Sequence, residues 1–105
     1  MGPLKTDIIR KCKIYPTKMP NIYNVITDIQ SSVLPDARLS YEVQHRGEDR
    51  WIVYVRIPNG SRSAKLEFLI DETSEGIDVA GSVLRYGSIK RRTVVTIMDA
   101  ITERL

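Results

Sequence analysis

The side chains best suited to binding chemistry in this chain are basic, and they are concentrated in two short segments. Residues 85–92 contain four bases and no acid, and residues 1–20 contain five bases against the single acid Asp7, so each segment carries a local charge of +4. Since the formal net charge is +3, the rest of the chain carries −5. This separation of charge predicts an anionic partner near the two segments, and a solvated surface without a ligand is the alternative.

The second basic segment coincides with the expected start of a helix. A helix N-terminus carries roughly half a positive charge, so consecutive bases there are unfavourable by about a few tenths of a kcal/mol each. A bound anion reverses that effect, because free N–H groups and basic side chains both bind phosphate, and Gly87 lets a phosphate approach the backbone. The GxxxxGK[ST] spacing of a P-loop is missing. The sequence predicts an anion or nucleic-acid site made of the following residues: Arg85, Ser88, Lys90, Arg91, Arg92, Lys11 and Lys13.

The open face of the expected sheet is a second candidate surface. In the first strand, Lys11, Lys13 and Tyr15 are expected to point away from the core, whereas Ile8, Cys12 and Ile14 point inward. Basic residues interleaved with Tyr15 and Tyr54 resemble a platform for single-stranded nucleic acid, although no RNP-type motif is present. The same face predicts an apolar strip suited to a homodimer or a protein partner. The residues of this predicted interface are Tyr15, Ile52, Tyr54, Arg56 and Leu69, with Leu84 beside them.

Residues capable of catalysis or metal binding are scarce. Cys12 is the only cysteine and His45 the only histidine, so an internal disulfide is impossible and a zinc site would need several carboxylates. Their strands are expected at opposite edges of the sheet, which argues against a thiol–imidazole pair. The acids between Asp71 and Asp78 lack the spacing of a calcium loop and are expected to form a solvated turn. We therefore expect no catalytic site, no metal and no cofactor.

The hydrophobic pattern predicts the elements that position these side chains. Two segments, residues 20–33 and the C-terminal stretch that starts near Ser88 or Thr93, have the i, i+3, i+4, i+7 apolar spacing of amphipathic helices. Strand-like runs are expected at the following residues: 8–15, 38–45, 51–57, 64–71 and 77–84. Gly81 in the last run indicates a bulge or the close approach of a helix. This order predicts an α+β two-layer sandwich, β-α-β-β-β-β-α, with two helices on one face of a five-stranded antiparallel sheet.

The element order, together with Val79-Ala80-Gly81-Ser82 followed by an amphipathic helix, resembles one repeat of the TATA-box-binding protein. The resemblance covers nearly the whole chain and implies that the meander closes beside the first strand. It does not extend to the phenylalanine wedges of that family, because the only phenylalanine, Phe68, belongs to the inward-facing set. The chain also looks like small proteins common in archaea, although no motif carries that likeness.

Length and composition set the remaining expectations. The 105 residues suffice for one domain, 1–105, and the 42% hydrophobic content is ordinary for a globular protein. No run approaches the roughly 20 apolar residues that span a bilayer, and residues 1–20 lack a signal-peptide core, so we expect no membrane partner and a cytoplasmic location. The functional expectation is a non-enzymatic module that binds nucleic-acid phosphates or another polyanion. The alternative is an assembly module that uses its open sheet face.

Overall fold

The computed structural model describes residues 8–13, 22–33, 38–59, 61–74 and 76–105, and for 8–13, 22, 23 and 33 it describes the backbone alone. The helices and strands follow the order predicted from the hydrophobic pattern. Their bounds are β1 Ile8–Lys13, α1 Ile22–Val33, β2 Ser40–His45, β3 Arg50–Ile57, β4 Ala64–Thr73, β5 Gly76–Arg85 and α2 Arg91–Arg104. The prediction of an α+β domain with an antiparallel sheet and two helices is confirmed.

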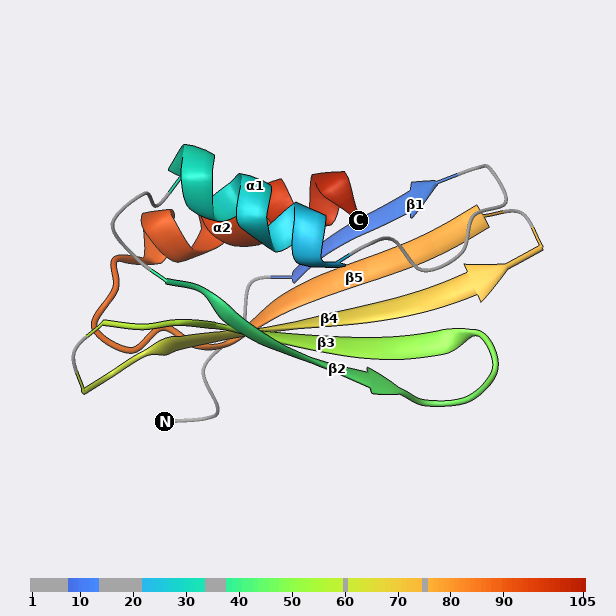
Figure 1. Ribbon diagram of the computed structural model, residues 1–105, viewed down its shortest axis with the longest axis horizontal. Coiled ribbons are helices and arrows are strands. Elements are labelled where there is room, and N and C mark those ends of the chain that lie inside the picture. The colour runs from blue at the N-terminus through green and yellow to red at the C-terminus, as the bar shows by residue number, and fades with distance from the viewer. Residues whose placement is uncertain (1–7, 14–21, 34–37, 60, 75) are drawn as a thin grey trace.

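The sheet has the order β1-β5-β4-β3-β2 within the described residues, and each neighbouring pair is antiparallel. Both helices lie on the same side of the sheet (Figure 1). α2 packs on β5, β1 and β4, and α1 packs beside α2. The opposite face has no helix over it among the described residues, and we call it the open face. β1 and β2 form the two edges of the sheet.

Alternation along the central strands separates a buried face from the open face. In β3, Val53, Val55 and Ile57 are buried, whereas Ile52, Tyr54 and Arg56 are half-buried or exposed on the other side. Period-2 alternation of this kind is what a strand with one covered face requires. The residues that complete the core from the other elements include Leu66, Phe68, Ile70, Ile77, Val79, Val83, Ile29, Val94, Ile97, Met98 and Ile101.

Gly81 marks a close approach of α2 to the sheet. A Cβ at this position would lie 2.9 Å from Cε1 of Phe68 and 3.0 Å from Oγ1 of Thr102. The Thr102 hydroxyl is buried and donates a hydrogen bond to the carbonyl oxygen of Met98 at 2.8 Å. Close helix packing, and not a bulge, is therefore the reason for a glycine here. The bulge of β5 lies three residues further on, at Leu84.

No helix in the described part of the chain is long and apolar enough to cross a membrane.

Candidate anion-binding surface

Three basic residues lie side by side on the open face, one on each of three neighbouring strands. Arg56 of β3 is the register partner of Lys65 in β4, and Lys65 is the register partner of Arg85 in β5. Side chains of register partners on one face have Cβ atoms about 4.5–5.5 Å apart, and like charges at that separation destabilise the sheet. A bound anion would turn this repulsion into attraction for all three cations at once.

A β-bulge places Arg85 in this row. Leu66 pairs with Val83, but Lys65 pairs with Arg85, so Leu84 is an extra residue on β5. Leu84 is 40% exposed and has no register partner on β4. Without the extra residue, Leu84 would lie opposite Lys65, and Arg85 would lie opposite the buried Ala64. Bulges redirect side chains in this way at functional sites.

The Arg85 guanidinium is held by the turn that connects β3 and β4. Its Nε donates to the Ser63 carbonyl oxygen at 3.0 Å, and its Nη2 donates to the Ser63 hydroxyl at 3.3 Å. Ser88 reaches the same turn, because its backbone N–H donates to the Arg62 carbonyl oxygen at 3.1 Å. These contacts fix the loop that follows β5 against residues 62–63.

Gly87 makes this close packing possible. Its φ is +62°, and a Cβ on it would collide with the backbone carbonyl oxygens of Arg62 and Ser63. Only glycine combines that left-handed conformation with so close an approach. The sequence predicts that Gly87 admits a phosphate to the backbone, whereas the structure shows that it admits the neighbouring turn.

The helix that follows begins with basic residues. α2 starts at Arg91, between the two starting points that the sequence suggests, and Lys90 is its N-cap. The Lys90 side chain makes no capping hydrogen bond, and the first turn of α2 contains no acid. Lys90, Arg91 and Arg92 are exposed. The start of α2 therefore lacks the two features that usually stabilise it, a capping side chain and an acidic residue.

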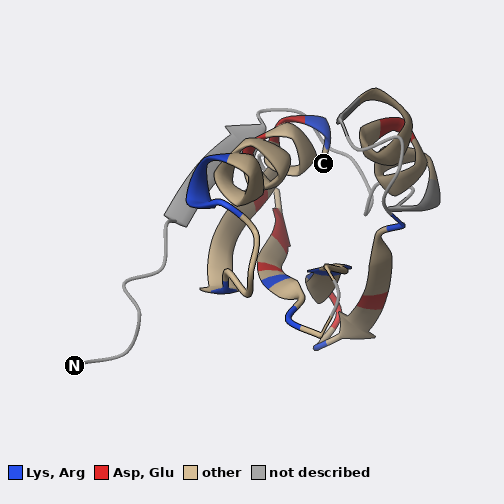
Figure 2. Cartoon of the chain, turned by 90° about the vertical axis from the view of Figure 1, so that its left-hand side faces the viewer, with Lys and Arg blue, Asp and Glu red and all other residues tan. Residues whose placement is uncertain are grey.

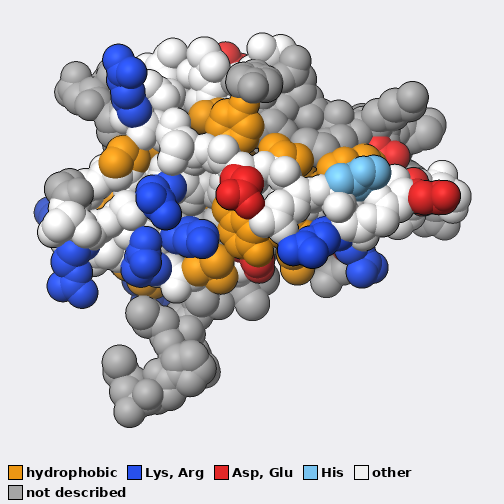
Figure 3. Space-filling view, turned by 60° about the horizontal axis from the view of Figure 1, so that its bottom comes forward, with side chains coloured by type: hydrophobic (Ala, Val, Ile, Leu, Met, Phe, Trp, Pro, Cys, Tyr) orange, Lys and Arg blue, Asp and Glu red, His pale blue; other side chains and the backbone are white. Residues whose placement is uncertain are grey.

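The row on the sheet and the start of α2 lie at the same end of the molecule (Figure 2). We call this surface the basic end and define it by Arg56, Arg62, Lys65, Arg85, Lys90, Arg91 and Arg92. Basic side chains gather toward one end of the face drawn in Figure 3. The sequence predicts Arg85 and residues 90–92 as members of one site, and the structure adds Arg56, Arg62 and Lys65 to them.

An acidic row borders the basic row on the open face. Glu42 of β2 pairs with Tyr54 of β3, and Tyr54 pairs with Glu67 of β4. Desolvation of the Tyr54 phenol and its hydrogen bond to the Glu67 carboxylate raise the pKa of Tyr54 above its ordinary value. Lys65 Nζ lies over the Tyr54 ring, 4.9 Å from its centroid, which is a cation–π contact.

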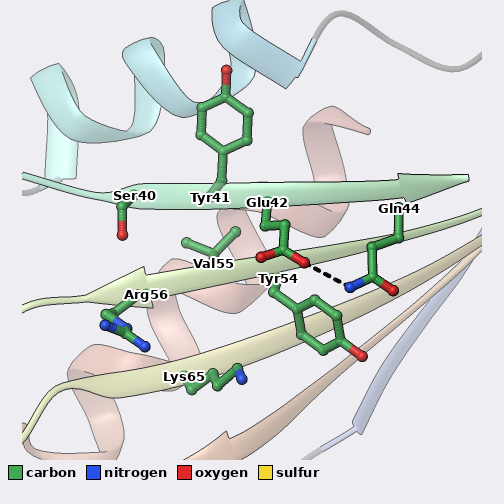
Figure 4. Close-up of a pocket in the computed structure, with 8 residues that line it drawn as sticks. All are labelled: Ser40, Tyr41, Glu42, Gln44, Tyr54, Val55, Arg56 and Lys65. Atoms are coloured by element: carbon green, nitrogen blue, oxygen red, sulfur yellow. Dashed lines mark hydrogen bonds between the residues drawn. The ribbon is translucent and has the colours of Figure 1, made fainter.

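Arg56 and Lys65 of the basic row and Glu42 and Tyr54 of the acidic row line a shallow hollow of about 480 Å³ (Figure 4). Tyr54, Arg56 and Lys65 lie on its floor, and the β2 edge with Glu42 and Gln44 forms its rim. The Gln44 side chain donates to the Glu42 carboxylate at 2.6 Å, so this acid is bound by a residue of its own strand. The hollow thus joins cations and an aromatic ring, the combination that binds a phosphate and stacks on a base.

Lys11 and Lys13, predicted for this site, are on β1, of which the structure describes the backbone alone. Lys11 pairs with Val79, Lys13 with Ile77 and Cys12 with Asp78. Since the side chains of β1 lie outside what the structure describes, the assignment of Lys11 and Lys13 to the site stays a prediction. Tyr15 is also outside the described residues.

Ile52, Tyr54, Arg56 and Leu69 of the predicted sheet-face interface lie on the open face, and Tyr15 is outside the described residues. Ile52 and Leu69 are register partners on the open face, and Leu69 is 42% exposed. Tyr54 and Arg56 continue the same face of β3. Leu84, in contrast, is the extra residue of the bulge between Val83 and Arg85 and has no register partner on β4, so it does not extend the apolar strip.

His45 and Cys12 are on β2 and β1, at opposite edges of the sheet as predicted. The His45 ring stacks on Trp51 with centroids 5.1 Å apart and an interplanar angle of 8°, and His45 is exposed. Among the described residues, no group of three or more histidine, cysteine or acidic side chains is placed to hold a metal ion.

No family model, curated protein or solved structure matches this chain. The geometry of the basic end is therefore the basis for the functional proposal.

Proposed function

We propose that this protein is a small non-enzymatic module that binds nucleic-acid phosphates, or a polyanion of similar spacing, at its basic end. The observation that carries the proposal is the row Arg56–Lys65–Arg85, in which the register sets each cation beside the next. Like charges aligned across strands cost stability, and the bulge at Leu84 adds a third cation to the row instead of removing one. The start of α2, with no side-chain cap, supplies N–H groups and further cations at the same end of the molecule.

We further infer that the topology is that of one repeat of the TATA-box-binding protein, since β1 lies beside β5 and both helices cover one face. The proposed binding mode differs from that family's. Phe68 is buried in the core, so the open face has no phenylalanine wedge among its described residues. Tyr54 next to Lys65 and Arg56 favours single strands, whose bases can stack on a ring while the cations follow the backbone.

A charge-reversal pair with a matched control tests this function. The variant Lys90→Glu/Arg92→Glu alters the basic end, and Arg46→Glu/Arg50→Glu changes the net charge equally at the other end of β2 and β3. Fluorescence anisotropy of a labelled mixed-sequence single strand and its duplex, recorded at several salt concentrations, gives the affinity. We expect the first variant to weaken binding by at least about tenfold and to reduce the salt slope by about 1.4 to 1.8, corresponding to two lost phosphate contacts.

Equal losses in the two variants would show that net charge alone attracts the nucleic acid, and would overturn the proposed site. Absence of binding by the unaltered protein at low salt would overturn the function itself. Circular dichroism of each variant checks that the fold is retained.

The sheet-face interface stays a prediction. The pair Ile52–Leu69 is the observation in its favour, but the acidic row of Glu42 and Glu67 borders it on one side, and it forms a narrow strip.

A further inference from the structure

The outer edge of β2 is unpaired in the part of the chain that the structure describes. β2 is the last strand in the sheet order and pairs with β3 alone. Strands at the edge of a sheet are usually protected by proline, lysine or a bulge, because their unpaired peptide groups attract another strand. The six residues Ser40–His45 contain no proline and no lysine, and their register with β3 has no shift.

The hydrogen-bond phase shows which peptide groups of β2 point outward. The backbone N–H of Arg46 donates to the Arg50 carbonyl oxygen at 2.8 Å. Hydrogen-bonded and non-hydrogen-bonded pairs alternate along an antiparallel ladder, so the peptide groups of Gln44 and Glu42 also face β3. Those of Val43 and His45 face away from it. The ladder between β3 and β4 is consistent with this assignment. The backbone N–H of Glu72 donates to the Asp49 carbonyl oxygen at 2.7 Å, so the peptide groups of the odd-numbered residues of β3 face β4.

Val43, at the middle of this edge, is also an exposed hydrophobic residue. It shares the helix side of the sheet with its buried partner Val53, yet it is 39% exposed. The helices therefore leave the β2 edge of the core side uncovered at this point. An added strand would bury Val43 and satisfy its outward N–H and carbonyl groups together.

The sequence of β2 is complementary to itself in an antiparallel register centred on Val43. A twofold axis at Val43 places Val43 opposite Val43 of a second copy, Glu42 opposite Gln44, and Tyr41 opposite His45. The apolar, hydrogen-bonding and aromatic pairs are each favourable across strands. In the register centred on Glu42, two carboxylates would meet directly, which is destabilising. The register centred on Gln44, which sets Glu42 opposite Arg46, is the competing one, and it loses the Val43–Val43 pair. Registers in between would set open-face residues against helix-side residues and cannot form in one continuous sheet.

We propose that a second copy of this chain pairs with β2 through this register, so that the two sheets join into one sheet across a twofold axis at Val43. The interface rests on one pair of strands. We therefore expect the dimer to be weak and its population to depend on protein concentration in the range measured below. It does not include the row Arg56–Lys65–Arg85, although Glu42 and Gln44 also form the rim of the open-face hollow, and its test does not depend on nucleic-acid binding.

Sedimentation equilibrium of the full chain over a range from micromolar to about millimolar measures the association. Val43→Pro removes the outward N–H without breaking a bond to β3, because proline is tolerated on the solvent side of an edge strand. We expect it to weaken the dimer at least tenfold, whereas Val43→Thr, which keeps the N–H and the branched side chain, retains it. Val43→Lys serves as a second disrupting variant if the proline variant does not fold.

Single-cysteine variants in a Cys12→Ser background test the register directly. Opposite residues in a hydrogen-bonded pair have Cα atoms about 5.5 Å apart, within the range for a disulfide. Diagonal neighbours are about 7–8 Å apart. We therefore expect Val43→Cys to form a disulfide-linked dimer under oxidising conditions and Glu42→Cys to remain largely uncrosslinked. Cross-linking of Glu42→Cys but not Val43→Cys would overturn the register. A monomer at every concentration, or a dimer unaffected by both Val43→Pro and Val43→Lys, would overturn the interface.

Discussion

Arg85 lies beside Lys65 on the open face because β5 contains one extra residue, Leu84, between its pairs with Leu66 and Lys65. The bulge moves a cation into a row that already holds Arg56 and Lys65. Ser63 then fixes the Arg85 guanidinium through two hydrogen bonds. Such a surface would be preorganised for the anion that we propose, because its charge is already concentrated and oriented, and this would lower the entropic cost of binding.

The variant Lys90→Asp is expected to change stability and nucleic-acid affinity in opposite directions. Lys90 has the extended backbone of an N-cap, with φ −60° and ψ 137°, but provides no capping oxygen. Aspartate accepts hydrogen bonds from the first N–H groups and complements the helix dipole, so we expect the free energy of unfolding to rise by about 0.5–2 kcal/mol. The affinity for a labelled single strand should fall at the same time. Urea unfolding and anisotropy measure the two quantities.

A variant Lys90→Ala serves as the control, because it removes the charge without adding a cap. Loss of stability in Lys90→Asp would contradict the assignment of Lys90 as an N-cap lacking a side-chain partner.

Gly81→Ala is expected to destabilise the fold. The new Cβ would lie within 3.0 Å of Phe68 and Thr102, and neither can yield freely because both are fully buried. Overpacking of this kind costs about 1–3 kcal/mol. Urea denaturation of Gly81→Ala gives the change, and Ser82→Ala, the next residue along β5, is expected to have a much smaller effect. Equal stability of Gly81→Ala and the unaltered protein would show that α2 can move away from β5 at little cost.

Glu67→Gln is expected to lower the pKa of Tyr54 toward its ordinary value of about 10. Desolvation and the Glu67 carboxylate raise that pKa, and the variant removes the negative charge that favours the neutral phenol. A tyrosine whose pKa is raised on folding stabilises the fold fully below about pH 10, and this contribution is lost as the pH rises through the folded-state pKa. NMR titration of ¹³C-labelled tyrosine rings measures the shift, with Glu48→Gln as the control. An unchanged Tyr54 titration in Glu67→Gln would refute the coupling.

Local periodicity in the sequence is sufficient to predict several parts of this protein. The spacing of Val94, Ile97, Met98 and Ile101 is sufficient to predict α2, because a 3.6-residue period places them on one buried stripe. Period-2 alternation likewise assigns Arg56 and Lys65 to the open face. Gly81 stands out as a point of special packing, since a glycine inside a strand weakens it unless a bulge or a close neighbour requires one.

The remaining features, above all the set of cations that share a surface, depend on how the strands pair. Whether Lys65 meets Arg85 or Leu84 depends on one extra residue in β5, and nothing in the local pattern of either strand reveals it. The register of β1 with β5 is likewise set by contacts distant in sequence, and the local pattern of Ile8 to Lys13 does not reveal it. A slip of one residue exchanges the two faces of a strand, so the tertiary structure, not the local sequence, determines which cations share a surface.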